Sequence, residues 1–258
     1  MKKRKATRCI ILKSPRELEL MRVANRIVAE VLNELSESLQ PGISTHDLDR
    51  IATEGIIKRG AVPAFKGYRG YPASLCVSVN DEVVHGIPSP ERIILEGDLV
   101  SMDLGSIVEG YYGDAALSRL VGSGSEEASR LIEVTVQALC KGIERARPRA
   151  RLQDISWAIQ EVVEKAGFSI VRQFVGHGIG RSLHEPPEVP NFGRPGQGPL
   201  LKPGMVFAIE PMVNAGGPEV RVLEDGWTAV TVDGSLSAHW EHSVAITENG
   251  PEILSMLQ

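Results

Sequence analysis

Residues 98–120 of the chain read DLVSMDLGSIVEGYYGDAALSRL, and this stretch decides the fold. Its two halves, 98–108 and 111–120, are rich in apolar residues and predict a pair of strands. Because only Glu109 and Gly110 separate them, we expect a two-residue hairpin turn. The stretch therefore predicts an antiparallel hairpin whose register is set by its turn.

The hairpin would bring two carboxylates onto one face. Asp103 is expected opposite Ala116, with Asp114 two residues along on the same face. A slip of one residue would turn Asp114 to the other face, so the prediction depends on the turn. Carboxylates this close repel each other, and a divalent cation would let both stay ionised. Either Asp alone would more often be a capping or turn residue.

Two helices are expected before the hairpin. The first begins at Ser14, where Pro15 and Glu17 complete a capping box with a proline in the first turn. Its apolar residues recur every three or four positions up to Pro41-Gly42. A second helix is expected at about 45–60.

The same order of elements then starts again. A shift of 107 residues without a gap aligns apolar helix positions and several polar or glycine positions of the two halves. We favour duplication over chance agreement, because the register runs from the helices into the strand that carries Asp103. The matched pairs are Pro41 with Pro148, Asp47 with Asp154, Gly60 with Gly167, Gly97 with Gly204, and Asp103 with Glu210.

The second half offers more metal-binding residue types. Glu210 follows an apolar strand, Glu241 lies in a second apolar run, and His177 stands between glycines in 176–180. With the two aspartates, this gives oxygen-rich ligation with a single nitrogen, which suits manganese, iron(II), cobalt or zinc. Carboxylates that can bridge predict two ions about 3.5 Å apart. The glycines lack the spacing of a dinucleotide or phosphate loop, so that alternative is weak.

Other histidines and aromatic residues divide into two groups. We expect His85 and His184 to be functional, since both adjoin loops rich in glycine or proline. His46, His239 and His242 are expected to be structural. The sequence leaves open whether a further set is core or pocket wall: Phe65, Tyr68, Tyr71, Cys76 and Trp227.

Composition limits the classes of function. The chain has 258 residues, a mass of 28.0 kDa and a formal charge of −5, which disfavours general binding to nucleic acid. No apolar run approaches the ~20 residues of a membrane span, and three scattered cysteines argue against a disulfide framework. We expect a cytoplasmic protein. We expect residues 1–12 to form a basic, flexible arm, most simply a solvated tail, with a weak RNA or ribosome anchor as the minority alternative.

Taken together, these residues indicate a known family. The set Asp103, Asp114, His177, Glu210 and Glu241, with NDEVVHGIP at 80–88 and GHGIG at 176–180, closely resembles bacterial type I methionine aminopeptidases. The resemblance covers residues 13–258. It implies an α/β "pita-bread" metallopeptidase fold, in which two pseudo-symmetric halves share a curved antiparallel sheet with helices on its outer face. The halves would be 13–122 and 123–258 of a single catalytic domain.

The resemblance also implies a reaction. Members of this family remove the initiator methionine from nascent proteins when the second residue is small. Asp103 would hold one metal ion, and His177 with Glu210 the other. Asp114 and Glu241 would bridge both. A water of lowered pKa between the ions would attack the first peptide bond.

Further roles follow from the same resemblance. Glu210 would act as general base and then acid. His184 would contact the scissile carbonyl, and His85 the peptide nitrogen of the second residue. The methionine pocket would be lined by Tyr68, Tyr71, Cys76 and Trp227. Phe65 and Leu183 occupy positions that vary in the family.

Two alternatives remain at this point. A prolidase or aminopeptidase P would share the fold, but such enzymes usually carry an extra N-terminal domain, and only about 100 residues precede Asp103. A non-enzymatic binding protein is disfavoured by the complete ligand set. The expected partners are nascent N-termini and, weakly, the ribosome, with no membrane and no sequence-specific nucleic acid. We expect a monomer.

Overall fold

A computed structural model describes residues 9–257 of the protein. The helices in this range are α1 (Pro15–Ser38), α2 (Thr45–Lys58), α3 (Glu126–Arg145) and α4 (Leu152–Lys165), with a 3₁₀ helix, η1 (Tyr68–Gly70). The strands are β1 (Val62–Pro63), β2 (Leu75–Val79), β3 (Glu82–Val84), β4 (Leu99–Val108), β5 (Tyr111–Leu120), β6 (Ser169–Ile170), β7 (Gly176–Gly178), β8 (Glu185–Val189), β9 (Val206–Ile209), β10 (Met212–Asn214), β11 (Val220–Val222), β12 (Ala229–Thr231), β13 (Ser237–His239), β14 (Glu241–Thr247) and β15 (Gly250–Ile253). Most of the basic segment predicted as an arm, residues 1–8, lies outside the described range.

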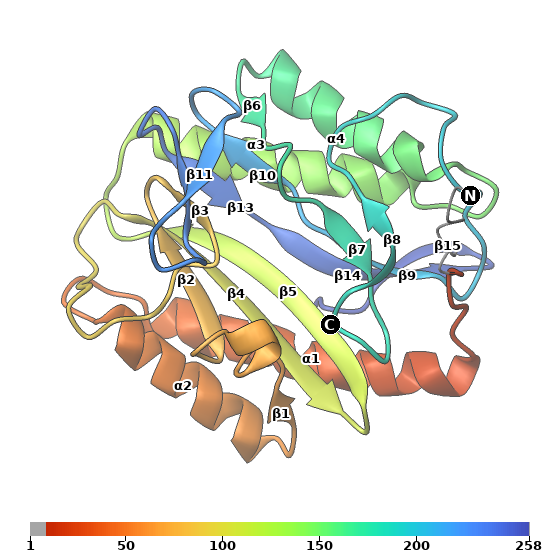
Figure 1. Ribbon diagram of the computed structural model, residues 1–258, viewed down its shortest axis with the longest axis horizontal. Coiled ribbons are helices and arrows are strands. Elements are labelled where there is room, and N and C mark those ends of the chain that lie inside the picture. Colours follow the sequence, from red (N-terminus) through yellow and green to blue (C-terminus); the bar gives the residue numbers. More distant parts are fainter. Residues whose placement is uncertain (1–8, 258) are drawn as a thin grey trace, which may run out of the picture.

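One large antiparallel sheet organises the molecule. Its strands follow the order β1-β4-β5-β14-β9-β7-β8, with β2 paired to β4 and β15 paired to β14. Helices α1 and α2 lie along one side of the fold and α3 and α4 along the other (Figure 1). Two three-stranded sheets, β13-β10-β6 and β11-β12-β3, complete the described part of the chain. The architecture confirms the predicted fold class.

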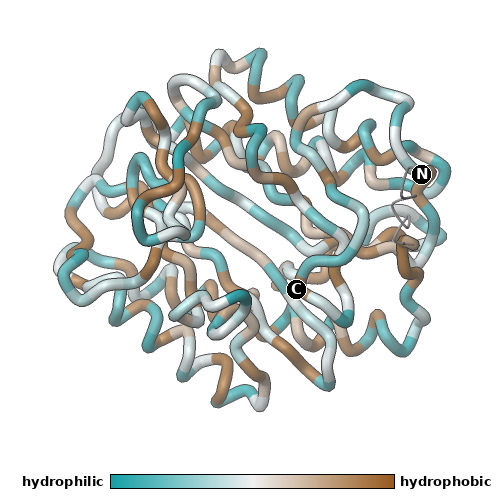
Figure 2. Tube along the Cα trace, viewed as in Figure 1, coloured by the Kyte–Doolittle hydropathy of each residue, from teal (hydrophilic) through white to brown (hydrophobic). Residues whose placement is uncertain are grey.

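Successive residues of each strand point to opposite faces of the sheet, and the residues on one face are apolar and pack against the helices. Val100, Met102 and Leu104 of β4 pack into the core formed with α1 and α2. Phe207 of β9 and Val244 of β14 pack into the core formed with α3 and α4. Figure 2 shows apolar and polar residues alternating along the helices, as expected when each helix buries a single stripe. The odd-numbered residues of β4, including Asp103, are left on the opposite face.

The predicted hairpin is present with the predicted register. Glu109 and Gly110 both have positive φ, 47° and 79°, which is the conformation that a tight turn between twisted strands requires. Asp103 pairs with Ala116, and Asp114 lies two residues from Ala116. The turn therefore places both aspartates on the face that the helices leave free.

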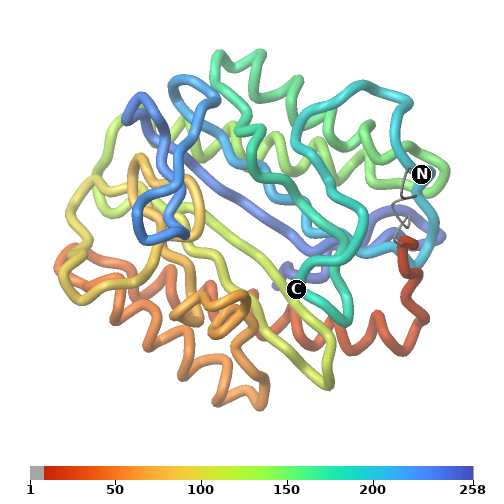
Figure 3. Tube along the Cα trace, in the orientation of Figure 1, coloured from red at the N-terminus to blue at the C-terminus, as the bar shows by residue number. Residues whose placement is uncertain are grey.

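The internal repeat corresponds to a structural repeat. In Figure 3 the first half of the chain, red to yellow-green, fills one side of the molecule, and the second half fills the other. Residues that the repeat aligns make equivalent hydrogen bonds. Asp47 accepts a hydrogen bond from the backbone N–H of Ser44, and Asp154 accepts one from that of Arg151, at the starts of α2 and α4 (3.4 and 2.7 Å).

Matched glycines behave alike as well. Gly60 and Gly167 follow the ends of α2 and α4 with φ of 76° and 84°. Gly97 and Gly204 have φ of 86° and 89°, and each donates its N–H to the carbonyl of a neighbouring segment. Since only glycine adopts this conformation at little cost, the aligned glycines mark two copies of one chain path.

A buried ion pair fastens the start of the domain. The Lys13 Nζ lies 2.6 Å from Glu185 Oε2, with side chains 3% and 5% exposed. Glu185 Oε1 also accepts the backbone N–H of Arg181 and Ser182 (2.8 and 3.3 Å). The pair therefore holds the loop that leads from β7 to β8 and carries His184.

We expect Lys13→Met to lower the free energy of unfolding by roughly 3–5 kcal/mol, because it leaves the Glu185 carboxylate buried without its cation. Urea denaturation followed by circular dichroism measures the change. The double variant Lys13→Met/Glu185→Gln should recover part of the loss, since it also removes the stranded charge.

Lys141→Met provides the matched control. Lys141 pairs with Glu144 at 2.8 Å, but these side chains are 56% and 54% exposed. Breaking an exposed pair should cost less than about 1 kcal/mol. An equal loss of unfolding free energy in Lys13→Met and Lys141→Met would contradict the proposed contribution of the buried pair to stability.

Candidate metal centre

A row of residues crosses the middle of the large sheet. Cys76 of β2 pairs with Asp103 of β4, Asp103 pairs with Ala116 of β5, and Ala116 pairs with Glu241 of β14. Paired residues in antiparallel strands point to the same face. The sheet register alone therefore aims Asp103 and Glu241 at one spot, with only the small Ala116 between them.

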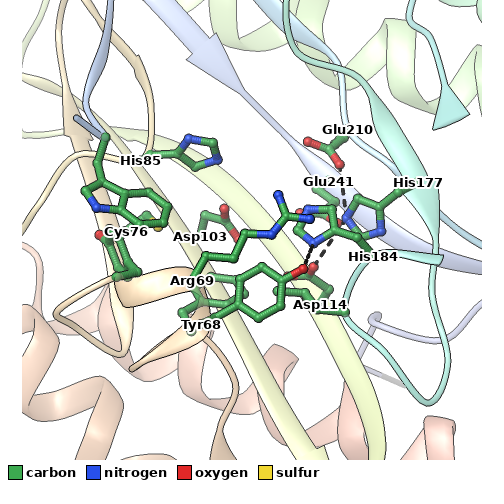
Figure 4. Close-up of a pocket in the computed structure, with 14 residues that line it drawn as sticks. Tyr68, Arg69, Cys76, His85, Asp103, Asp114, His177, His184, Glu210 and Glu241 are labelled. Atoms are coloured by element: carbon green, nitrogen blue, oxygen red, sulfur yellow. Dashed lines mark hydrogen bonds and ion pairs between the residues drawn. The ribbon is translucent and has the colours of Figure 1, made fainter. Parts of the chain in front are cut away.

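The remaining candidate ligands surround that spot. His177 Nε2 lies 3.4 Å from Glu210 Oε1 and 3.8 Å from Asp114 Oδ2. Asp114, His177 and Glu241 each offer a ligand atom, and these atoms all lie within 4.8 Å of one another. Figure 4 shows the five side chains together along one wall of a pocket. All five residues predicted as ligands are therefore in one place, although Asp103 and Glu210 are not part of the tightest group.

The imidazole of His177 is oriented for a ligand. Its Nδ1 lies 3.0 Å from the carbonyl oxygen of Gly178. A carbonyl can only accept, so Nδ1 carries the hydrogen and Nε2 presents a lone pair to the carboxylates. Burial lowers the pKa of His177 to about 4, so the ring stays neutral near pH 7. Gly176 and Gly178 let the backbone on either side of His177 pack closely against neighbouring backbone, because a Cβ on either glycine would lie 2.4 Å from a backbone oxygen.

The carboxylates lack positive partners. Burial raises the pKa of Asp103 to about 7. It raises those of Asp114, Glu210 and Glu241 well above their ordinary values, and the negative charges of neighbouring carboxylates add to the effect. One oxygen each of Asp103, Asp114 and Glu241 is buried with no hydrogen-bond partner among the described residues. A divalent cation would satisfy these oxygens and offset the repulsion, so the residues fit a metal.

A pocket opens over the carboxylates. Its lining contains every residue predicted for the site, together with three others. The full set is Phe65, Tyr68, Arg69, Tyr71, Cys76, His85, Asp103, Asp114, His177, Leu183, His184, Glu210, Trp227 and Glu241. The structure thus gathers metal ligands, histidines and apolar wall in one cavity.

The two predicted functional histidines stand on the rim of this cavity. His184 Nδ1 lies 2.8 Å from the Tyr68 hydroxyl, and its ring centroid is 4.2 Å from that of His177. His85 packs edge-on against Phe174 and Trp227. Burial is the main cause that lowers their pKa values, to about 3 for His184 and about 4 for His85. Both rings are therefore neutral near pH 7 and can each donate and accept one hydrogen bond.

The pocket wall is apolar and locked in place. The Tyr71 hydroxyl donates to the carbonyl oxygen of Leu75 or Gly86 (3.1 and 2.9 Å), and its ring packs edge-on against Trp227. Cys76 is buried beside them, and burial raises the pKa of its thiol, which therefore stays protonated. These side chains give this part of the pocket an apolar wall.

Two residues at the site were missed by sequence reasoning. His239, expected to be structural, is buried with its Nε2 4.0 Å from Glu210 Oε2, and this Nε2 has no hydrogen-bond partner among the described residues. Arg69 lines the pocket mouth. A signal existed for His239, which lies two residues before Glu241 and so on the same face of an extended chain. None existed for Arg69. His242, also expected to be structural, bonds Ser255 through Nδ1 (2.9 Å).

Of the helices in residues 9–257, none is both long and apolar enough to cross a lipid bilayer.

Comparison with known proteins places the chain in a family. The sequence model of metallopeptidase family M24 matches residues 19–248. The methionine aminopeptidase of Clostridium perfringens (strain 13 / Type A) is 57% identical over 249 residues, which span 96% of this chain and 100% of the relative. A solved structure of methionine aminopeptidase from Thermotoga maritima superposes with a TM-score of 0.95 at 49% identity, covering 96% of this chain and 100% of that one.

A more distant structure shares the fold alone. Prolidase from Pyrococcus furiosus superposes with a TM-score of 0.79 at 24% identity, and this chain covers 66% of it. The near relatives align along almost the whole chain, and the predicted family is confirmed. The chain belongs to metallopeptidase family M24, among the bacterial methionine aminopeptidases.

Proposed function

We propose that this chain is a metal-dependent aminopeptidase that removes the initiator methionine from nascent proteins and peptides whose second residue is small. One observation carries the proposal. Four carboxylates and one neutral imidazole line the same cavity as an apolar wall that suits methionine. Aromatic rings such as Tyr71 and Trp227 also make favourable contacts with a thioether sulfur.

Two divalent ions would occupy the cluster. Asp103 would hold one, His177 and Glu210 the other, and Asp114 and Glu241 would bridge them. The donor set, oxygen-rich with one nitrogen, accepts manganese, iron(II), cobalt or zinc. When bound, such ions supply Lewis acidity and a water of lowered pKa for attack on the first peptide bond.

The chain's own residues handle protons and orientation. Glu210 would take the proton of the attacking water and pass it to the leaving amine. If the Tyr68 hydroxyl donates to Nδ1 of His184, the Nε2–H of that ring is free to donate to the scissile carbonyl oxygen. His85, on the opposite rim, would accept from or donate to the peptide group of the second residue. These neutral rings can do this without a protonation step.

The setting of the enzyme is also a proposal. We infer a monomeric cytoplasmic protein whose catalytic domain spans 13–258 in two halves, 13–122 and 123–258. Its partners would be nascent chains, with neither a membrane nor sequence-specific nucleic acid involved; the net charge of −5 supports the last point. Weak ribosome association through the basic arm, 1–12, would rest mainly on residues outside the described part of the chain.

Removing metal should abolish release of methionine from a Met-Ala-Ser peptide, and adding back manganese, iron(II), cobalt or zinc should restore it, because the carboxylates alone supply no Lewis acid. Free methionine is measured by chromatography, and metal content by mass spectrometry. Asp114→Asn, which removes a bridging carboxylate, should not recover under the same conditions. Full activity in thoroughly demetallated protein would contradict the proposal.

Replacing either rim histidine should slow the chemistry while leaving the metal in place. We expect His85→Ala and His184→Ala to lower kcat by about 100-fold, the usual scale for a lost transition-state hydrogen bond. Metal content per chain should match the wild type, since neither ring reaches the carboxylate cluster as a ligand. A parallel loss of metal and turnover in one variant would reassign that histidine as a ligand.

Substrate choice separates this function from the prolidase alternative. Peptides beginning Met-Ala should be cleaved far faster than Xaa-Pro peptides, because the apolar pocket accepts the first side chain and no feature of the described site reads a proline ring. The comparison uses kcat/KM at equal metal loading. Faster turnover of Xaa-Pro peptides would replace the proposed function with a proline-specific one.

A further inference from the structure

Arg69 is an unassigned charged residue at the mouth of the catalytic pocket. It lies in the short loop of η1, between Tyr68 and Gly70, and lines the pocket together with His85 and His184. Figure 4 shows its side chain reaching across the mouth from the Tyr68 side toward His184. The guanidinium therefore lies where the pocket opens.

Arg69 also borders a second hollow. This neighbouring groove shares Arg69, His177 and His184 with the catalytic pocket, so the two cavities meet at these residues. Beyond them the groove runs along a wall made of Ile10, Val175, Gly176, Glu185, Pro186, Pro187, Glu188 and Pro199. Because methionine would fill the inner pocket, the chain after the cleaved bond has this groove as an exit. The third residue would then lie about 7 Å beyond the first, within reach of Arg69.

The backbone at Arg69 is held in an unusual conformation. Its φ and ψ are 50° and 21°, in the left-handed region that costs a non-glycine residue roughly 1 kcal/mol or more. Gly67 and Gly70 on either side also have positive φ, and the Gly67 N–H donates to the carbonyl oxygen of Tyr71 (2.8 Å), which closes the loop. The loop thus fixes the base of a long side chain, whose guanidinium carbon lies 5.3 Å from the centroid of the Tyr68 ring.

Arg69 has no carboxylate partner in the described part of the chain. Among residues 9–257, no carboxylate oxygen comes within 4.0 Å of its guanidinium. Of the two acids in the groove wall, Glu185 is engaged by Lys13, and Glu188 is exposed.

We propose that Arg69 and the adjoining groove form a subsite for a peptide carboxylate beyond the second residue of the substrate. The proposal rests on the proposed aminopeptidase function and adds a preference to it. The carboxylate could belong to an acidic side chain at the third or fourth residue, or to the C-terminus of a short peptide. Either would pair with the guanidinium through two N–H groups at the pocket mouth.

The test compares peptides that differ only in charge. Met-Ala-Glu, Met-Ala-Gln and Met-Ala-Lys, each as the C-terminal amide, are cleaved by the wild type at one metal loading. We expect kcat/KM to be about three- to tenfold higher for the Glu peptide than for the Gln peptide, and lower for the Lys peptide, as an exposed ion pair allows. We then measure kcat/KM for peptides of two to four residues as free acids and as amides. A higher value for the free acid shows that a C-terminal carboxylate is used. The preference should shrink as salt is raised.

The variants keep the loop while changing the charge. Asn and Asp tolerate left-handed φ better than other non-glycine residues, so Arg69→Asn and Arg69→Asp remove or reverse the charge with little strain. Arg69→Asn should equalise the kcat/KM values of the three amides. Arg69→Asp should favour the Lys peptide. Glu188→Gln, in the same groove, should retain the Glu preference.

The outcomes separate the two levels of the proposal. If the wild type cleaves the neutral Gln peptide but shows no Glu preference in either peptide series, the subsite is wrong and the aminopeptidase stands. A Glu preference that survives unchanged in both Arg69→Asn and Arg69→Asp also overturns the role of Arg69. If no Met-Ala peptide is cleaved at all, the proposed function itself fails. Reversal of preference in Arg69→Asp is a result that general loosening of the loop would not produce.

Discussion

Repulsion among buried carboxylates at the centre of the sheet is the constraint on which the rest of the structure depends. Asp103, Asp114, Glu210 and Glu241 converge on one spot, and burial raises the pKa of each. Apolar strands and helices behind the sheet supply the stability that lets such a cluster exist. A divalent cation would offset this repulsion and use the carboxylates as ligands, so metal binding would also stabilise the fold.

The duplication explains how the cluster is assembled. Each half contributes a strand whose carboxylate, Asp103 or Glu210, occupies the matched position of the repeat. The halves meet where β5 pairs with β14, and this seam sets Glu241 beside Ala116 and thus one residue across from Asp103. Neither half alone contains a complete ligand set. Shifting the seam by one residue would turn Glu241 away, so the register between halves is under the same constraint as the metal.

Prediction from the sequence succeeded where the physics is local. The Glu109-Gly110 turn sets the hairpin register from two residues, and the repeat shows in the capping residues and the glycines. These features follow from turn geometry and helix ends, which depend on neighbours in the chain. Contacts between distant segments could not be derived in this way. The pairing of Lys13 with Glu185, and the approach of His239 to Glu210, require knowing which loops and strand ends meet.

The site divides between a rigid part and an adjustable one. The proposed metal ligands stand on or at the ends of strands whose register is fixed by pairing, where a shift of one residue would destroy the cluster. His85 and Arg69, by contrast, stand on loops and have positive φ, 62° and 50°, at the rim of the pocket. A residue in a loop can change without moving the sheet, so substitutions there are expected to alter contacts with the substrate and to leave the carboxylate cluster in place. The carboxylate cluster is thus held by the sheet, whereas the residues proposed to orient and select the substrate stand on its loops.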